Sequence, residues 1–145
     1  MSRTVRDVFD EGTAAFNAHD LNRFADVLAA DVSWSAPGAG GRGRDSCLAF
    51  YGSWLRAFPD AGVTVHDVHL LEDLVVERGT FSGRHGGDLA TPGGEIPPTG
   101  RTVAVDYVNR IRIRDGQHVA LDLMFDRLQL LEQLGLMPAP VMNGS

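Results

Sequence analysis

The sequence contains a single cysteine, Cys47, among 145 residues. A lone cysteine cannot form an intrachain disulfide, and it excludes a metal site built on several thiolates. The 13 basic residues form no cluster and are outnumbered by 19 acidic ones, so nucleic acid is not an expected partner. The sequence also lacks an apolar run of membrane-spanning length, and the charged N-terminal stretch MSRTVRDVFDEG has no apolar signal-peptide core. We therefore expect a cytoplasmic protein with no membrane partner.

The composition is that of an ordinary globular protein, with 43% hydrophobic and 22% charged residues. Residues 1–145 are enough for one domain, and no second domain fits. A chain of this length buries about 70% of the surface that it exposes when unfolded. It can therefore enclose a small-molecule cavity.

The periodicity of apolar residues changes from helical to alternating after residue 60. The sequence predicts a helix from Val5 to about Ala18, a short helix capped by Asp20, and a third helix over roughly 46–57 capped by Asp45. Extended segments are predicted at 32–35, 63–71, 74–84, 101–114 and 118–126, with a Gly-rich loop at 36–44. Helices followed by strands, without alternation between them, indicate an α+β fold in which three N-terminal helices pack on one face of a curved antiparallel sheet.

The connection at residues 86–100 is unusually long for a link between two strands. It spans fifteen residues and contains proline at positions 92, 97 and 98. Long loops of this kind often close over a binding site, so residues 86–100 are a candidate lid.

The last predicted strand carries the most suggestive pattern. From His118 to Asp126, Val119, Leu121, Leu123 and Phe125 point to one side, and His118, Ala120, Asp122, Met124 and Asp126 to the other. The second set contains no Lys, Arg, Ser or Thr, unlike a solvated face. We therefore predict that this face lines a cavity.

Several phrases, in their order along the chain, resemble a known family. They are FNAHDLNRFADVLAADVSW, AFYGSWLRAFPD, GTFSGRHGG, PPTGRTV, RIRDGQ and FDRLQLLEQLGL. Together they are similar to the SnoaL-like polyketide cyclases of the nuclear transport factor two-like superfamily. The resemblance covers about residues 16–136. It implies a cone-shaped α+β barrel, a homodimer, and a deep pocket between the sheet and the third helix that binds a hydrophobic polycyclic substrate without a metal or organic cofactor.

The resemblance also implies a reaction, the closure of a ring by an intramolecular aldol step. Asp122 matches the position of a polar residue on the final strand, and the acid–base role is carried onto it. His85 matches the His of a GTHTG-like phrase, written GRHGG here, and Asp126 matches the Asp of an F-D pair. Leu121 and Leu123 depart from the Glu and Trp that are frequent in relatives.

The residues themselves fit such chemistry. A carboxylate whose pKa is raised by apolar neighbours can remove a proton from carbon flanked by carbonyls, which is the role expected of Asp122. His85 assists, and His85, Asn109 or Tyr51 donates to the enolate oxygen. Flat apolar walls for the substrate are expected from Trp34, Trp54, Phe81 and Met124.

Other interpretations of these residues remain open. Asp126 is placed to cap the helix that follows it, and Asp106 could form a surface ion pair. An arrangement of Asp106, Arg110 and Asp122 would favour epoxide opening, provided that Arg110 does not lie on the outer face of the sheet. A cofactor-free hydroxylase and a non-catalytic binding protein are further alternatives. A metal site at His66 and His69 is disfavoured because the two side chains point to opposite faces of a strand.

Overall fold

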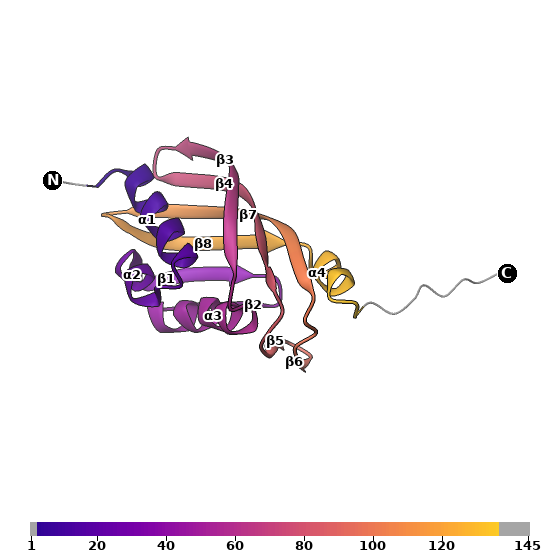
Figure 1. The fold of residues 1–145 in the computed structure, drawn as a ribbon. Helices are drawn as coiled ribbons and strands as arrows, with labels where there is room; N and C mark the ends of the chain where they lie inside the picture. Colours follow the sequence, from indigo (N-terminus) through magenta and orange to yellow (C-terminus); the bar gives the residue numbers. More distant parts are fainter. Residues whose placement is uncertain (1–2, 137–145) are drawn as a thin grey trace, which may run out of the picture.

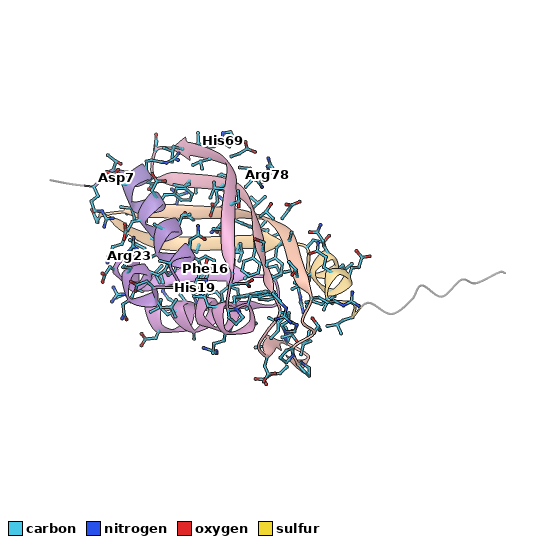
Figure 2. All side chains as sticks on the ribbon, in the orientation of Figure 1. Asp7, Phe16, His19, Arg23, His69 and Arg78 are labelled. Atoms are coloured by element: carbon cyan, nitrogen blue, oxygen red, sulfur yellow. The ribbon has the colours of Figure 1, made fainter. Side chains whose placement is uncertain are left out.

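Three helices cover one face of a six-stranded sheet in the computed structural model, which describes residues 3–136 (Figure 1). The helices are α1 (Val5–Asn17), α2 (Leu21–Asp26) and α3 (Arg44–Ala57). Phe16 of α1 lies inside the molecule, whereas Asp7 and Arg78 lie at its surface (Figure 2). The predicted α+β class is therefore confirmed.

The first two helices begin as the sequence predicts. The Thr4 hydroxyl accepts from the Asp7 backbone N–H at 3.0 Å, and the Asp7 carboxylate accepts from the Thr4 N–H at 3.1 Å, which completes a capping box. Asp20 caps α2 by accepting from the Arg23 N–H at 3.0 Å. The predicted cap of α3 is wrong, because Asp45 lies within the first turn and Gly43, with φ of 107°, occupies the N-cap position.

The sheet has the strand order β2-β1-β8-β7-β4-β3. Its strands are β1 (Leu28–Ala36), β2 (Ala39–Arg42), β3 (Gly62–Leu71), β4 (Leu74–Arg84), β7 (Thr102–Arg114) and β8 (Gln117–Phe125). The pairing of β1 with β8 is parallel and the other pairs are antiparallel, so the sheet is mixed and not antiparallel throughout as predicted. It has two free edges, β2 and β3, and does not close into the expected barrel.

Two predicted loops contain short strands. The Gly-rich segment includes β2, which pairs with the end of β1. Residues 86–100 include the hairpin of β5 (Leu89–Thr91) and β6 (Gly94–Ile96), which forms a separate two-stranded sheet. Strands of three or four residues are too short to show a recognisable alternation in the sequence.

The last helix, α4 (Arg127–Gln133), packs beside the end of β7 (Figure 1). Gln133 fixes it there, because its side-chain amide donates to the Ala104 carbonyl at 2.9 Å and accepts from the Ala104 N–H at 2.6 Å. In the described part of the chain, no helix combines the length and the apolar character required to span a membrane.

Candidate functional site

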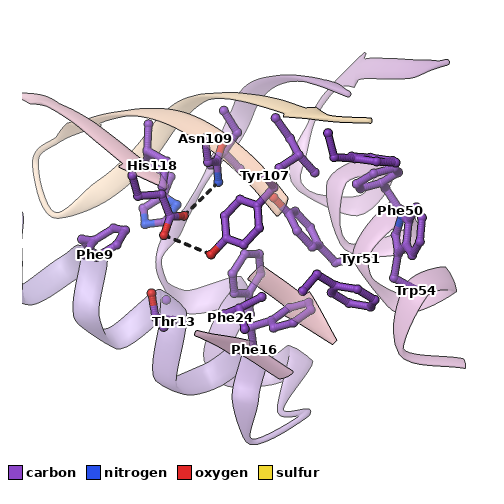
Figure 3. A pocket seen from close by; sticks show the side chains of 18 of the residues that line it. Phe9, Thr13, Phe16, Phe24, Phe50, Tyr51, Trp54, Tyr107, Asn109 and His118 are labelled. Atoms are coloured by element: carbon purple, nitrogen blue, oxygen red, sulfur yellow. Dashed lines mark hydrogen bonds between the residues drawn. The ribbon is translucent and has the colours of Figure 1, made fainter. Parts of the chain in front are cut away.

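A cavity of about 100 Å³ lies between the helices and the sheet face that they cover. Most of its wall is apolar. Seven aromatic side chains without a hydroxyl line it, namely Phe9, Phe16, Phe24, Phe50, Trp54, Phe81 and Phe125. The polar residues in the wall are Thr13, Tyr51, Glu77, Tyr107, Asn109 and His118 (Figure 3). A few polar groups within an aromatic enclosure are typical of a small-molecule site.

Glu77 is the only acidic residue among the described residues that line this cavity. It lies in the middle of β4 and its side chain is buried, with 6% relative exposure. Burial in apolar surroundings raises its pKa to about 7, although hydrogen bonds from Asn109 and Tyr107 oppose the rise. A carboxyl group with this pKa exchanges protons readily at neutral pH.

Two donors from β7 hold the Glu77 carboxylate. The Tyr107 hydroxyl donates to Oε2 at 3.2 Å, and Asn109 Nδ2 donates to Oε1 at 3.4 Å (Figure 3). Burial also raises the pKa of Tyr107, and the neighbouring Glu77 raises it further, so the phenol stays protonated as a donor.

Gly79 allows Tyr107 to reach Glu77. Gly79 pairs with Tyr107 across β4 and β7, and a Cβ atom at Gly79 would lie 2.6 Å from the Tyr107 hydroxyl oxygen. The ring therefore occupies the space that a side chain at position 79 would fill. The Tyr107 hydroxyl therefore lies beside Glu77, which is two positions before Gly79 in β4.

The structure brings four predicted site residues to the cavity. Asn109 is one of the two donors to Glu77, and Tyr51 lies on α3, where burial raises the pKa of its phenol. Trp54 and Phe81 form part of the aromatic wall, with ring centroids 5.6 Å apart.

His118 also lines the cavity, although strict alternation places it on the opposite face with Asp122. Arg112 pairs with Ala120, but Ile113 pairs with His118, so β8 contains a bulge with Val119 as the extra residue. The bulge turns His118 inward, where it is 2% exposed. Burial lowers the pKa of its imidazole to about 4, so the ring is neutral at pH 7.

Asp122, the predicted acid–base residue, lies outside the cavity. Its side chain is 50% exposed on the uncovered face of the sheet, accepts from the Ser35 hydroxyl at 2.7 Å, and lies 3.7 Å from an Arg110 nitrogen. Leu121 and Leu123 line the cavity in its place. The prediction that the Asp122 face of this strand forms a cavity wall is therefore wrong.

The proposed epoxide-opening arrangement lies on the same outer face. Asp106 is exposed and accepts from the Thr80 hydroxyl at 2.9 Å, and Arg110 is 56% exposed. Because Arg110 lies on the outer face, the condition set for epoxide opening is not met.

Three other predicted site residues have structural positions outside the cavity. Asp126 caps α4, because its carboxylate accepts from the Leu128 and Gln129 N–H groups at 2.9 and 3.2 Å. Trp34 donates to the Ser46 hydroxyl at 2.8 Å, and Met124 is 66% exposed on the outer face. None of the three contributes to the cavity wall.

His85 lies directly after β4, completely buried but away from the cavity wall. Its Nδ1 accepts from the Thr99 N–H at 3.1 Å, and its ring centroid lies 5.4 Å from that of Phe58. Its backbone N–H donates to the Arg101 carbonyl, and the Gly100 N–H donates to the His85 carbonyl. His85 therefore joins the two ends of segment 86–100, which is a structural role.

An outer groove of about 470 Å³ adjoins the cavity and includes residues of β5, β6 and α4. The two spaces have four lining residues in common, namely Phe50, Trp54, Phe125 and Leu130. These four residues border both spaces, and we refer to them as the partition side chains.

The sequence contains a signal for Glu77 that the prediction missed. On β4 the inward positions are Val75, Glu77, Gly79 and Phe81, so one acid interrupts an apolar face. A carboxylate on the buried side of a strand is rare without a partner, and it marks a candidate site.

Comparisons with known proteins agree with this architecture. The sequence model for the SnoaL-like domain matches residues 5–121. No curated protein matches the sequence. Among solved structures, IdmH from Streptomyces antibioticus, a candidate polyketide cyclase, is 30% identical, with a TM-score of 0.77 over 92% of this chain and 99% of that one.

Two further solved structures are similar over most of their length. AclR from Streptomyces galilaeus, a candidate hydroxylase, is 25% identical, with a TM-score of 0.79 over 92% of this chain and 97% of that one. TsrD from Streptomyces laurentii is 28% identical, with a TM-score of 0.79 over 92% and 96%. The family match covers most of the chain, and the resemblance found in the sequence is confirmed. The chain belongs to the SnoaL-like domain family.

Proposed function

We propose that this protein is a cofactor-independent enzyme that moves protons at carbon in an aromatic, polyketide-like molecule, with Glu77 as its acid–base residue. One observation carries the proposal: a buried carboxyl group with a pKa of about 7 inside an aromatic cavity. The similarity to a candidate polyketide cyclase supports an intramolecular aldol closure as the overall reaction.

Glu77 performs both proton transfers in this scheme. Its carboxylate removes a proton from carbon flanked by carbonyls, which leaves an enolate. The enolate carbon attacks a second carbonyl of the same molecule, a carbon–carbon bond forms, and the resulting alkoxide takes the proton back from Glu77. The product is an isomer of the substrate. Carbon between two carbonyls is acidic enough for a carboxylate base.

Tyr107 and Asn109 orient the base. Their hydrogen bonds leave Glu77 facing the cavity from β4, and the apolar wall keeps its pKa near neutrality. Asp122 has no part in this scheme because it lies on the other face of the sheet.

The substrate extends from the cavity toward the outer groove. The cavity alone is smaller than the ~300 Å³ at which drug-sized ligand sites begin, so a polycyclic molecule requires rotation of the partition side chains Phe50, Trp54, Phe125 and Leu130. The β5–β6 hairpin borders the groove. The lid role of residues 86–100 stays a prediction.

The similarity to AclR favours a second candidate function, hydroxylation. Both reactions begin with proton removal by Glu77. They differ in that a hydroxylase incorporates one oxygen atom of O2 and needs a two-electron reductant to release the other atom as water, so the mass of the product separates them.

The test is mass spectrometry of reactions with a tricyclic polyketide methyl ester, run with and without oxygen. We expect a product of unchanged mass that forms without oxygen and is lost in Glu77→Gln. The matched control is Asp122→Asn, which removes a charge from the opposite face. A gain of one oxygen atom only in air, and only with an added two-electron reductant, would establish hydroxylation, and equal turnover by wild type and Glu77→Gln would refute the role of Glu77.

We also propose a homodimer that forms through the uncovered face of the sheet. Val108 and Met124 are direct neighbours on β7 and β8 and are 39% and 66% exposed. An exposed apolar pair in the centre of a sheet face favours association with a second copy.

A further inference from the structure

Three buried polar atoms in the cavity wall have no hydrogen-bond partner within the described protein. They are both ring nitrogens of His118 and Oδ1 of Asn109. Buried polar groups are nearly always paired, and each unpaired one destabilises the fold. Their presence in one cavity indicates that a bound molecule supplies the partners.

The surroundings of His118 confine its imidazole to the cavity wall. A Cβ atom at Gly12 would lie 3.1 Å from His118 Cε1, so the ring packs directly against α1. The Val8 carbonyl lies near the ring, but it does not meet hydrogen-bond geometry with either nitrogen. Phe24 presents an apolar ring at a centroid distance of 6.3 Å.

The chemistry of the unpaired atoms specifies the missing partner. A neutral imidazole has one donor and one acceptor nitrogen, and an amide oxygen only accepts. A keto or ester oxygen cannot donate to either acceptor. A hydroxyl group both donates and accepts, so it is the group that fits His118 and Asn109 alike.

The two residues contact different parts of a ligand. His118 pairs with Ile113 on β7, four positions from Asn109, which is about 13 Å along the strand. Because the two backbones are this far apart, we expect a ligand that contacts both side chains to do so through two separate hydroxyl groups.

We propose that His118 and Asn109 Oδ1 form a hydrogen-bonding subsite for the hydroxyl groups of an aromatic ligand. The inference rests on the proposed function, because it requires the ligand to occupy this cavity, and it narrows the substrate class to hydroxylated, phenolic or enolic aromatic compounds.

The test compares two probes of nearly equal shape, 2-naphthol and 2-methylnaphthalene, by equilibrium dialysis at pH 7. The ratio of their dissociation constants in wild type is set against the same ratio in His118→Phe. This comparison cancels the difference in hydrophobicity between the probes. We expect the preference for 2-naphthol to fall about 5- to 10-fold in His118→Phe, as for the loss of one buried hydrogen bond.

The matched control is His85→Phe. His85 is also completely buried and its Nε2 is also unpaired, but it does not line the cavity. We expect the probe ratio to stay within about twofold of wild type. Thermal unfolding checks that each variant is folded, with His118→Leu and the exposed His66→Phe as replacements for a variant or control that does not fold.

A second measurement separates a ligand-binding histidine from a structural one. Without ligand, His118→Phe should unfold at a higher temperature than wild type, because an apolar ring of similar shape removes an unpaired buried polar group. An unchanged probe ratio in His118→Phe and His118→Leu would overturn the subsite. Equal turnover by wild type and Glu77→Gln would instead refute only the acid–base proposal, since the probe ratio is measured without turnover.

Discussion

Glu77 and Asn109 lie directly opposite each other on β4 and β7, and the Asn109 amide donates to the Glu77 carboxylate at 3.4 Å. Tyr107 donates to the second carboxylate oxygen at 3.2 Å. Both hydrogen bonds favour the ionised form, yet the apolar cavity outweighs them and the pKa rises to about 7. The adjacent strand therefore orients the carboxylate while burial sets its proton affinity.

The first prediction concerns the stability of Glu77→Gln. The pKa of Glu77 is about 7 in the folded protein and 4.5 as its ordinary value, so the folded state binds the proton more tightly. Ionisation of Glu77 therefore destabilises the fold as pH rises through 7, and has no effect below pH 4.5. We expect Glu77→Gln to be more stable than wild type at pH 8 by up to about 3 kcal/mol, with the difference vanishing near pH 4.5.

Urea unfolding at pH 4.5 and pH 8 measures this difference. The control is Glu95→Gln, an exposed glutamate on β6, which should change the free energy of unfolding by less than about 0.5 kcal/mol at both pH values. A Glu77→Gln protein that is less stable than wild type at pH 8 would contradict the prediction.

The second prediction concerns the pH dependence of turnover. If Glu77 must be ionised to act as base, kcat/KM should rise with pH and level off above a midpoint of about 7. Tyr107→Phe removes a hydrogen bond that lowers this pKa, so its midpoint should move to higher pH. Gly79→Ala should shift the midpoint in the same direction, because the added methyl group would lie 2.6 Å from the Tyr107 hydroxyl oxygen and 2.7 Å from the Thr64 carbonyl oxygen, so both must move.

Tyr51→Phe is the control for these two variants. Tyr51 lies near Glu77 and Asn109 in the same cavity, but no hydrogen bond joins its hydroxyl to the Glu77 carboxylate within the described residues. Its removal should therefore move the midpoint less than Tyr107→Phe does. A Tyr107→Phe profile that coincides with wild type would show that Tyr107 does not influence the titrating group.

Much of the fold is predictable from local patterns in the sequence. The capping box at Thr4 and Asp7 marks the start of α1, and regular alternation along residues 102–114 identifies the inward positions of β7. Both patterns depend on neighbours within a few residues. The parallel pairing of β1 with β8 joins segments almost ninety residues apart, as Ser35 and Asp122 show, and no local pattern specifies it.

The candidate site was only partly predictable, for two physical reasons. Alternation on β8 separates Asp122 from Leu121, but it does not say which of the two faces the helices cover. The bulge at Val119 then turns His118 to the face that the helices cover. No residue type in this part of the sequence indicates that a bulge is present. Glu77 was accessible from sequence, because it interrupts an otherwise apolar strand face with a charge.

The third prediction concerns two opposing titrations. The pKa of His118 is about 4 in the folded protein against an ordinary 6.5, so His118 makes the fold less stable as pH falls from 6.5 to 4. Glu77 has the opposite effect between pH 7 and 4.5. Each titration changes the free energy of unfolding by about 1.4 kcal/mol per pH unit. In wild type the two changes therefore largely cancel between pH 4.5 and 6.5.

Single variants should reveal each slope. As pH is lowered from 6.5 to 4.5, His118→Phe should become more stable and Glu77→Gln less stable relative to wild type, and the double variant should follow wild type. Urea unfolding at four pH values in this range measures all of them. If the free energy of unfolding of the two single variants changed with pH in the same way, the opposite pKa shifts of Glu77 and His118 would be contradicted.

The fourth prediction concerns association through the outer face. Met124→Glu places a charge in the apolar pair with Val108, so it should convert the proposed dimer to a monomer at micromolar concentration. Equilibrium sedimentation measures the mass. Leu71→Glu is the control, since Leu71 is 64% exposed at the end of the edge strand β3. A monomeric wild type would rule out the dimer.

The fifth prediction separates the two faces of the sheet through Asp122. Asp122→Asn keeps the shape of a side chain that bonds Ser35 and lies 3.7 Å from Arg110, both away from the cavity. The ion pair is half exposed, so its loss should change the free energy of unfolding by less than about 1 kcal/mol. Turnover should stay within about twofold of wild type, whereas removal of a general base costs about 100-fold or more. Steady-state kinetics of Asp122→Asn and Glu77→Gln in parallel make the comparison. If Asp122→Asn lost activity while Glu77→Gln kept it, the reaction would have to take place on the uncovered face, with Asp122 as the acid–base residue and Arg110 as a fixed positive charge beside it.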